Sequence, residues 1–274
     1  MADEAASLLT NPAQDAGQTI AYSLSVILIT KDEADNIHAC LESVAWADEI
    51  IVVDSGSSDG TAEICRELGA RVYIHDWPGF GAQKNRALNY ATGDWVLSLD
   101  ADERVTPGLR RDIEAVLGRE AANAAYDIPR LSNYCGRFMR HSGWWPDYVT
   151  RLWRRGKARF SEDHTHDRVI VDGKMGRLRQ PVMHEAVTDL EQMLVKINMY
   201  SSSSAAIFHR DGRRASVFTA LLHGGWAFFR TYFLRLGFLD GREGLMLAVI
   251  NAENSYYRYA KLMLLGKPRQ LSDE

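Results

Sequence analysis

Short apolar runs alternate with amphipathic stretches in the first part of the chain. The runs cover residues 24–30, 49–54, 71–75 and 94–99 and are rich in Val, Ile and Leu. The segments between them have apolar residues at helical spacing, which predicts helices over 32–43, 61–68 and 81–91. Continuous apolar runs are typical of strands that are covered on both faces, as in parallel sheets. The alternation therefore predicts an α/β fold with a doubly wound, mainly parallel sheet.

The pattern changes after the fourth run. One more strand is predicted over 126–130, whereas residues 132–179 are irregular, aromatic and basic, which indicates loops with short strands. From residue 191 onward the pattern is helical. One apolar stripe there follows alternating four- and three-residue steps, and it contains Phe218, Leu222, Gly225, Phe229, Tyr232 and Leu236.

Composition and charge narrow the range of partners. The 274 residues are 46% apolar and 25% charged, which is ordinary for a folded protein, and the net charge of −4 gives no overall basic field for binding nucleic acid. From Val195 to the end, however, eleven Lys and Arg residues stand against six Asp and Glu residues. A basic, aromatic segment of this kind indicates contact with an anionic surface.

The cysteines and the start of the chain indicate a cytoplasmic protein. Cys40 and Cys65 fall in predicted helices and, with Cys135, show no metal-type spacing, so we expect buried free thiols in a reducing compartment. Residues 1–22 are small and polar and predict a flexible tail without a signal peptide. No apolar run approaches the roughly 20 residues that span a bilayer.

Two carboxylates follow the fourth apolar run. Asp100 and Asp102 lie one residue apart, at the carboxyl end of a predicted parallel strand, where such sheets bind ligands. Because alternate residues of an extended segment point the same way, both carboxylates can face one ligand. A hard divalent cation shared with phosphate oxygens would relieve their repulsion. The pair therefore predicts a metal–diphosphate site that holds Mg²⁺ or Mn²⁺.

Four motifs in a fixed order resemble the nucleotide-binding half of family 2 glycosyltransferases, which have the GT-A fold. They are Thr30-Lys31-Asp32-Glu33, Val53-Asp54-Ser55-Gly56-Ser57-Ser58-Asp59-Gly60-Thr61, Gln83-Lys84-Asn85-Arg86-Ala87 and Asp100-Ala101-Asp102. The finer resemblance is to bacterial lipopolysaccharide-core β-1,4-glucosyltransferases. It rests on the segments 76–85, 143–147 and 237–241 and covers nearly the whole folded chain.

The resemblance implies a division of the chain into parts. A GT-A catalytic domain would cover 23–190, with a nucleotide half over 23–103 and an acceptor half over 104–190. A helical, basic and aromatic C-terminal region would cover 191–274.

It also implies roles in binding a UDP-sugar. Asp54 would accept a hydrogen bond from uracil N3–H, although a turn or helix-cap role is the alternative. Thr30 and Glu33 would contact the nucleoside, and for Glu33 a charge in the first turn of a helix is the alternative. Lys84 would reach the diphosphate as a point charge, and Asp100 would contact ribose or metal-bound water.

The remaining implied roles concern the metal ion. Asp102 would ligate it directly, and His184 matches a position from which many GT-A enzymes bring a histidine to the metal. An isolated histidine is as readily a core or surface residue. The ion would stabilise charge on the departing UDP.

An inverting transfer needs a carboxylate base on the acceptor side. The resemblance favours Asp167, in a Thr-His-Asp segment where the family more usually has Val-His-Glu, and Asp147 is the alternative. Trp144, Trp145 and Arg151 would bind the acceptor, because indole faces stack on sugars and arginine forks bind phosphate and carboxylate.

These roles imply a metal-dependent hexosyltransferase that moves glucose from UDP-glucose onto a heptose of the lipopolysaccharide inner core. The enzyme would be cytoplasmic and peripheral on the inner membrane. Alternatives are a transferase with another nucleotide sugar or lipid-linked acceptor, and a non-catalytic module that binds sugar nucleotides or glycans. The stripe from Phe218 to Leu236 would lie on the membrane, pack on the catalytic domain, or form the seam of a homodimer.

Overall fold

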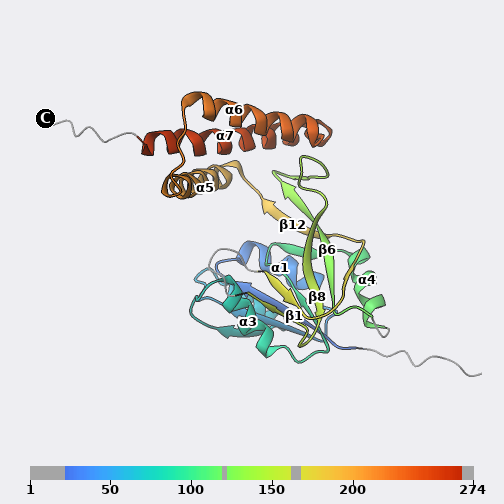
Figure 1. Ribbon diagram of the computed structural model, residues 1–274. Coiled ribbons are helices and arrows are strands. Elements are labelled where there is room, and N and C mark those ends of the chain that lie inside the picture. The colour runs from blue at the N-terminus through green and yellow to red at the C-terminus, as the bar shows by residue number, and fades with distance from the viewer. Residues whose placement is uncertain (1–21, 119–121, 162–167, 267–274) are drawn as a thin grey trace, which may run out of the picture.

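The computed structural model describes residues 22–118, 122–161 and 168–266. It confirms the α/β class, the mainly parallel order of the first strands and the helical C-terminal region (Figure 1). The strands within residues 22–98 are β1 (Leu24–Thr30), β2 (Glu49–Asp54), β3 (Arg71–Ile74) and β4 (Trp95–Ser98). The helices between them are α1 (Ala34–Ser43), α2 (Thr61–Glu67) and α3 (Phe80–Tyr90).

One large mixed sheet forms the centre of this part, in the order β3-β2-β1-β4-β8-β6-β12-β5. The first four strands are parallel, and Thr30 lies beside Asp54 in the register of β1 and β2. The remaining strands of this sheet follow residue 102 in the chain. They are β5 (Glu103–Val105), β6 (Ala125–Tyr134), β8 (Asp147–Arg154) and β12 (Val182–Val187). Shorter strands lie beside them, namely β7 (Arg137–Phe138), β9 (Ala158–Phe160), β10 (Val169–Val171) and β11 (Met175–Arg177).

Strand β8 corrects the interpretation of 132–179 as loops with short strands only. It pairs antiparallel with both β4 and β6, so it joins the two halves of the sheet. Leu152 and Trp153 are fully buried. This strand could not be predicted from the apolar pattern, because polar Thr150 and Arg151 interrupt that pattern. Arg151 can be buried only because ion pairs within the protein compensate its charge.

A local sequence signal explains where the helix after β5 begins. Thr106 accepts a hydrogen bond from the Leu109 amide across 3.0 Å and so caps α4 (Pro107–Leu117), which the sequence reasoning did not predict. Helices α1 and α4 pack on one side of the sheet, and α3 covers the other. Cys40 and Cys65 are buried and free, as predicted.

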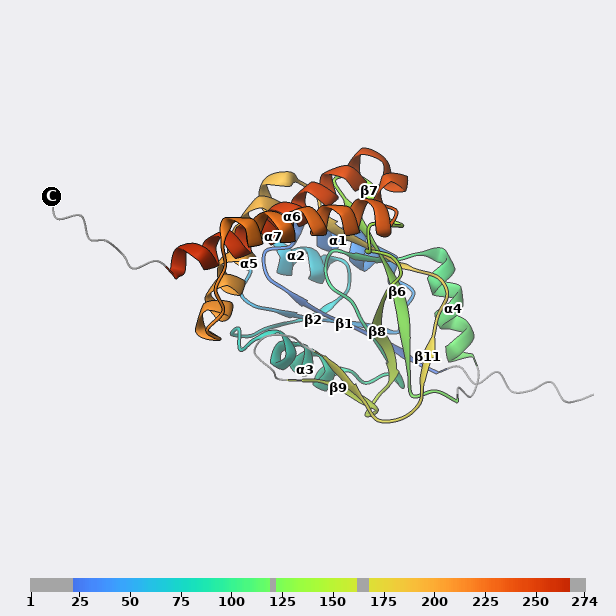
Figure 2. The ribbon, with the colours of Figure 1, turned by 45° about the horizontal axis from the view of Figure 1, so that its top comes forward.

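Three long helices form a separate layer above the ends of β6 and β12 (Figures 1 and 2). They are α5 (Leu190–Arg210), α6 (Val217–Phe229) and α7 (Gly241–Leu265). A π-helical turn over Arg230–Leu234 and a 3-10 turn over Gly237–Asp240 join α6 to α7. In Figure 1 α7 lies between α6 and the large sheet, so α6 is the outermost helix. None of the helices in the described ranges is both long and apolar enough to cross a membrane.

Asp240 connects this layer to the loop before β8. Its carboxylate is 2% exposed and accepts hydrogen bonds from the amides of Arg140 and His141, from His141 Nδ1 and from Ser142 Oγ. The Ser142 amide in turn donates to the carbonyl of Arg235 across 2.8 Å. The loop that carries Trp144 and Trp145 is therefore fixed to the helical layer.

Candidate active site

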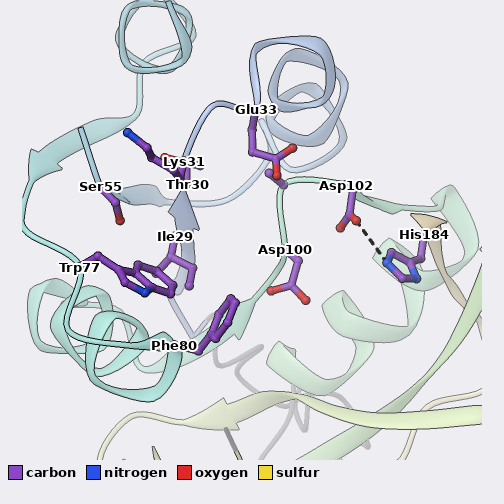
Figure 3. A pocket seen from close by; sticks show the side chains of 11 residues that line it. Ile29, Thr30, Lys31, Glu33, Ser55, Trp77, Phe80, Asp100, Asp102 and His184 are labelled. Carbon is purple, nitrogen blue, oxygen red and sulfur yellow. Dashed lines mark ion pairs between the residues drawn. The ribbon is translucent and has the colours of Figure 1, made fainter. Parts of the chain in front are cut away.

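A cavity of about 640 Å³ opens where β1, β2 and β4 end, at the carboxyl edge of the parallel strands (Figure 3). It collects residues from five separated segments of the chain. Its lining consists of Ile29, Thr30, Lys31, Glu33, Ser55, Trp77, Phe80, Asp100, Ala101, Asp102 and His184. Five of the predicted site residues, Thr30, Glu33, Asp100, Asp102 and His184, thus lie around one cavity.

Asp54 lies under the cavity wall with an exposed fraction of 0%. Its carboxylate accepts hydrogen bonds from the amides of Gly56 and Ser57, at 2.9 and 2.8 Å, and from the hydroxyls of Thr30 and Ser57. A carboxylate has about four lone-pair sites, so these bonds occupy it. Asp54 therefore shapes the turn over 55–60, and its hydrogen bond to uracil stays a prediction.

Glu33 is half-buried at the cavity edge and accepts a hydrogen bond from Asn36 Nδ2 across 3.0 Å. Burial raises the pKa of Glu33, and the nearby charges of Asp102 and Asp100 raise it further. The cavity therefore concentrates negative charge, which favours a cation or a hydrogen-bond donor as part of the ligand.

Asp100 is held from its far side by two cations. Lys84 Nζ lies 3.1 Å from one carboxylate oxygen, and Arg151 bonds to the other. Burial alone would raise the pKa of the Asp100 carboxylate. The positive charges of Arg151 and Lys84 have the larger, opposite effect and hold this pKa far below its ordinary value. Asp100 therefore stays ionised, and it holds Lys84 close to the strand end where a diphosphate would lie.

Glu103 is a member of this cluster that the sequence reasoning missed. It is fully buried, accepts a hydrogen bond from Arg151 at 2.6 Å, and accepts another from the Asp100 amide at 3.0 Å. Burial raises the pKa of Glu103 against the pull of Arg151. The sequence feature that could have identified Glu103 is its position three residues after Asp100, at the start of a strand. Arg151, predicted to bind the acceptor, is 6% exposed and is engaged with these two carboxylates.

Asp102 and His184 face each other across the cavity mouth, with 3.2 Å between the carboxylate oxygen and Nε2 (Figure 3). His184 lies on β12, and its other ring nitrogen is 2.9 Å from Ser132 Oγ. A partner on Nδ1 fixes the ring so that Nε2 points at the carboxylate, an arrangement typical of histidines that ligate metals. Asp102 and His184 come together because β12 pairs with β5, which places His184 opposite Glu103, the residue after Asp102.

The donor set fits a divalent ion that is shared with a diphosphate. Within the described ranges no group of three or more His, Cys, Asp or Glu side chains could hold a metal. Mg²⁺ commonly binds through one or two carboxylates together with substrate phosphates and water. If such an ion binds here, Asp102 and His184 would supply the protein part of its site, and a nucleotide would supply the rest.

Two aromatic side chains lie at the cavity rim, in the segment 76–85, for which the sequence analysis predicted no individual roles. Trp77 and Phe80 are 46% and 62% exposed, and their rings meet edge to face with centroids 4.8 Å apart. Such exposed rings can stack on a nucleobase or a sugar face.

A second cavity, of about 290 Å³, is lined by Trp144, whereas the other two predicted acceptor residues, Trp145 and Arg151, are not part of its lining. Asp147 lies there and accepts bonds from Arg130 at 2.7 and 3.0 Å. Trp144 lines the same cavity and packs edge to face on Tyr134, whereas Trp145 lies near the Arg140 guanidinium. Asp167, the favoured base, lies outside the described residues.

The chain is similar in sequence or in fold to several known proteins. Residues 25–184 match the family model described as glycosyl transferase family 2. An uncharacterized glycosyltransferase of Rickettsia felis is 33% identical over 257 residues, covering 87% of this chain and 89% of that protein. The lipopolysaccharide core biosynthesis glycosyltransferase LpsC of Rhizobium meliloti is 27% identical and covers 86% and 93%. Among solved structures, S. aureus TarS 1-349 is 17% identical, with a TM-score of 0.47 and coverage of 88% and 90%.

Proposed function

The chain belongs to glycosyl transferase family 2, and from this premise we propose that it transfers glucose from UDP-glucose to a heptose of the lipopolysaccharide inner core. The observation that carries the proposal is the convergence of Asp100, Asp102 and His184 at the mouth of one cavity beside the buried Lys84. The likeness to LpsC supports lipopolysaccharide core as the acceptor class.

The large cavity would hold the nucleotide. Its volume of about 640 Å³ suits a nucleotide sugar, since ligand pockets commonly measure about 300–1,000 Å³. Trp77 and Phe80 offer ring faces at the rim, and Thr30 and Glu33 offer polar atoms. Lys84, which is paired with Asp100 behind the cavity, would bring positive charge toward the diphosphate. The turn that Asp54 organises would support the base.

Asp102 would hold a divalent ion, Mg²⁺ or Mn²⁺, with His184 beside it. The ion, when bound, would stabilise negative charge on the departing diphosphate. His184 is kept in position by Ser132 and presents Nε2 to the same space as the Asp102 carboxylate. Asp100 keeps Lys84 directed at the strand end.

The acceptor would enter from the side of the smaller cavity, which Trp144 and Asp147 line. A carboxylate on the acceptor side would take the proton from the acceptor hydroxyl while the hydroxyl oxygen attacks the anomeric carbon and the bond to UDP breaks. We assign this role to Asp167, with Asp147 as the alternative. Because the acceptor is carried on a lipid, the enzyme would work at the cytoplasmic face of the inner membrane.

The deciding experiment is turnover of a panel of nucleotide sugars by the purified protein, with Mg²⁺ or Mn²⁺ and with chelator, in the presence of heptose-terminated core acceptor. We expect UDP-glucose to be used best, and only with metal. Preference for another sugar nucleotide would correct the donor. Binding of UDP-glucose without turnover on any acceptor would favour a non-catalytic sugar-nucleotide module.

A further inference from the structure

Helix α6 turns its small residues inward and its large apolar residues outward. Ala220, Gly224 and Ala227 are its buried positions. A Cβ atom added at Gly224 would lie 3.2 Å from Tyr256 Cβ, so α6 and α7 approach each other closely through this small-residue face. The opposite side carries large apolar side chains that are 45–68% exposed, and these are Val217, Phe218, Leu221, Leu222, Trp226 and Phe229.

The exposed apolar surface continues through the turns that follow α6. Phe229 and Phe233 pack together with centroids 5.3 Å apart, and Trp226 stacks near Phe229 at 6.0 Å. Five further side chains are 45–57% exposed, namely Phe233, Leu234, Leu236, Phe238 and Leu239. We call the exposed apolar side chains of residues 217–239 the outer face. Contiguous apolar surfaces of this kind mark interaction sites rather than ordinary solvent-facing surface.

The charged residues of the segment that carries the outer face all have one sign. Residues 212–239 contain four arginines, Arg213, Arg214, Arg230 and Arg235, and no Asp or Glu. All four arginines are exposed. The partner of this surface must therefore be apolar where the aromatic side chains enter it and anionic around them.

We propose that the outer face lies on an anionic phospholipid bilayer, with Phe218, Trp226 and Phe229 among the side chains that enter the interface. A helix with an apolar face and arginine flanks, too short to span, is the form that lies in the plane of a membrane. Arginine guanidinium groups would pair with lipid phosphates at the depth of the headgroups.

Charge argues against a second copy of this chain as the occupant. In a two-fold dimer the same patch meets itself. The outer face would then bring arginines toward arginines with no acidic residue of the segment to separate them, and like charges repel. An anionic bilayer removes this repulsion and covers the apolar side chains at once.

This inference deepens the proposed function, since it names the surface through which the enzyme would meet its lipid-borne acceptor. Its test uses vesicles without acceptor or nucleotide, so that loss of membrane binding and loss of transfer are separate results. A protein that turns over UDP-glucose but ignores vesicles would contradict the inference alone.

The first measurement is co-sedimentation of the full chain with vesicles of phosphatidylcholine, alone or mixed with phosphatidylglycerol. We expect binding to the mixed vesicles, and we expect the double substitution Phe218→Ser with Trp226→Ser to lower the partition coefficient by about tenfold or more. Ile74→Ser is the control, because Ile74 is an apolar side chain of similar exposure, 53%, on the edge strand β3 and outside the outer face. Arg230→Gln should weaken binding about fivefold on anionic vesicles only.

The second measurement locates the inserted side chains by quenching of tryptophan fluorescence with brominated lipid. Trp226→Phe keeps an apolar ring and should lose most of the quenching, whereas Trp77→Phe, at the exposed cavity rim, should retain it. Equal and negligible binding to both kinds of vesicle would overturn the inference. Self-association in solution that the double substitution abolishes would overturn it too, in favour of a dimer seam.

Discussion

Arg151 and Glu103 form an ion pair inside the sheet, with 2.6 Å between a guanidinium nitrogen and a carboxylate oxygen. Arg151 is 6% exposed and Glu103 is fully buried. The same guanidinium binds Asp100, so one side chain from β8 fixes both ends of the segment that carries the two aspartates of the cavity. The position of Asp100 at the cavity therefore depends on a side chain from β8.

Arg151→Met should destabilise the protein by about 3–5 kcal/mol, because it leaves two carboxylates buried without their cation. Urea unfolding followed by circular dichroism measures this. Adding Glu103→Gln to the same variant should recover part of the loss, since one of the uncompensated charges is then removed. A loss below about 1 kcal/mol for Arg151→Met would mean that water or Arg130 replaces the missing cation.

Asp102→Asn should abolish transfer and leave the free energy of unfolding nearly unchanged, because the side chain lies at the cavity mouth and not in the core. Its amide is a much weaker ligand for a hard divalent ion than a carboxylate. Turnover of UDP-glucose with Mg²⁺ or Mn²⁺, and after chelation, provides the measurement. Full activity in chelator would show that the cavity works without a metal ion.

Asp54→Ala should weaken UDP binding by about 1–3 kcal/mol, the usual effect of leaving buried hydrogen-bonding groups unpaired. Calorimetric titration with UDP measures it. Ser57→Ala is the informative control, since it removes one hydrogen bond to Asp54 and keeps the carboxylate. Equal losses in the two variants would assign Asp54 to the turn alone, and a larger loss for Asp54→Ala would support contact with the base.

Asp167→Asn should lower kcat by about a hundredfold or more, on the scale of general-base catalysis, with little change in UDP-glucose affinity. Asp147→Asn is the paired test, because Asp147 lines the smaller cavity and is partly neutralised by Arg130. If only the second substitution gives this phenotype, the base lies beside the tryptophan loop.

The reactivity of the three cysteines tests how deeply their thiols are buried. Burial raises the pKa of Cys65 to about 12 and raises that of Cys40 still further. At pH 8 the thiolate fraction of Cys65 is then about one in ten thousand, so a thiol reagent should modify neither residue in the native protein. Cys135, which is partly exposed, should react first, and all three should react in urea. Fast labelling of two or more thiols without denaturant would contradict this burial.

Periodicity and motif order were enough to predict the parallel half of the sheet and its class. These strands follow directly from the uninterrupted apolar segments at 26–29 and 50–53. Strand β8 could not be predicted in this way. Its central Arg151 is buried through ion pairs with residues about 50 positions earlier, and no local pattern carries such a partner.

The C-terminal stripe shows a second limit of periodicity. The stripe predicted from Phe218 to Phe229 is helical, but it is the exposed side of α6, and the buried side is the small-residue one. Apolar spacing predicts that a helix has one apolar side. It does not predict which side is buried, because that depends on how closely the neighbouring helix can approach. The chain also leaves the α-helix at Arg230, so Leu236 lies beyond the stripe's helix with a positive φ of 54°.

The anchoring of residues 140–142 by Asp240 has a consequence for which acceptors the protein can reach. The tryptophan loop and the helical layer are joined by buried hydrogen bonds, so they keep one spacing. With the outer face of α6 resting on lipid, the acceptor cavity would stand at a set height above the bilayer. A sugar would then be selected partly by how far it extends from its lipid, and glycans that are one residue shorter or longer would be presented at the wrong level.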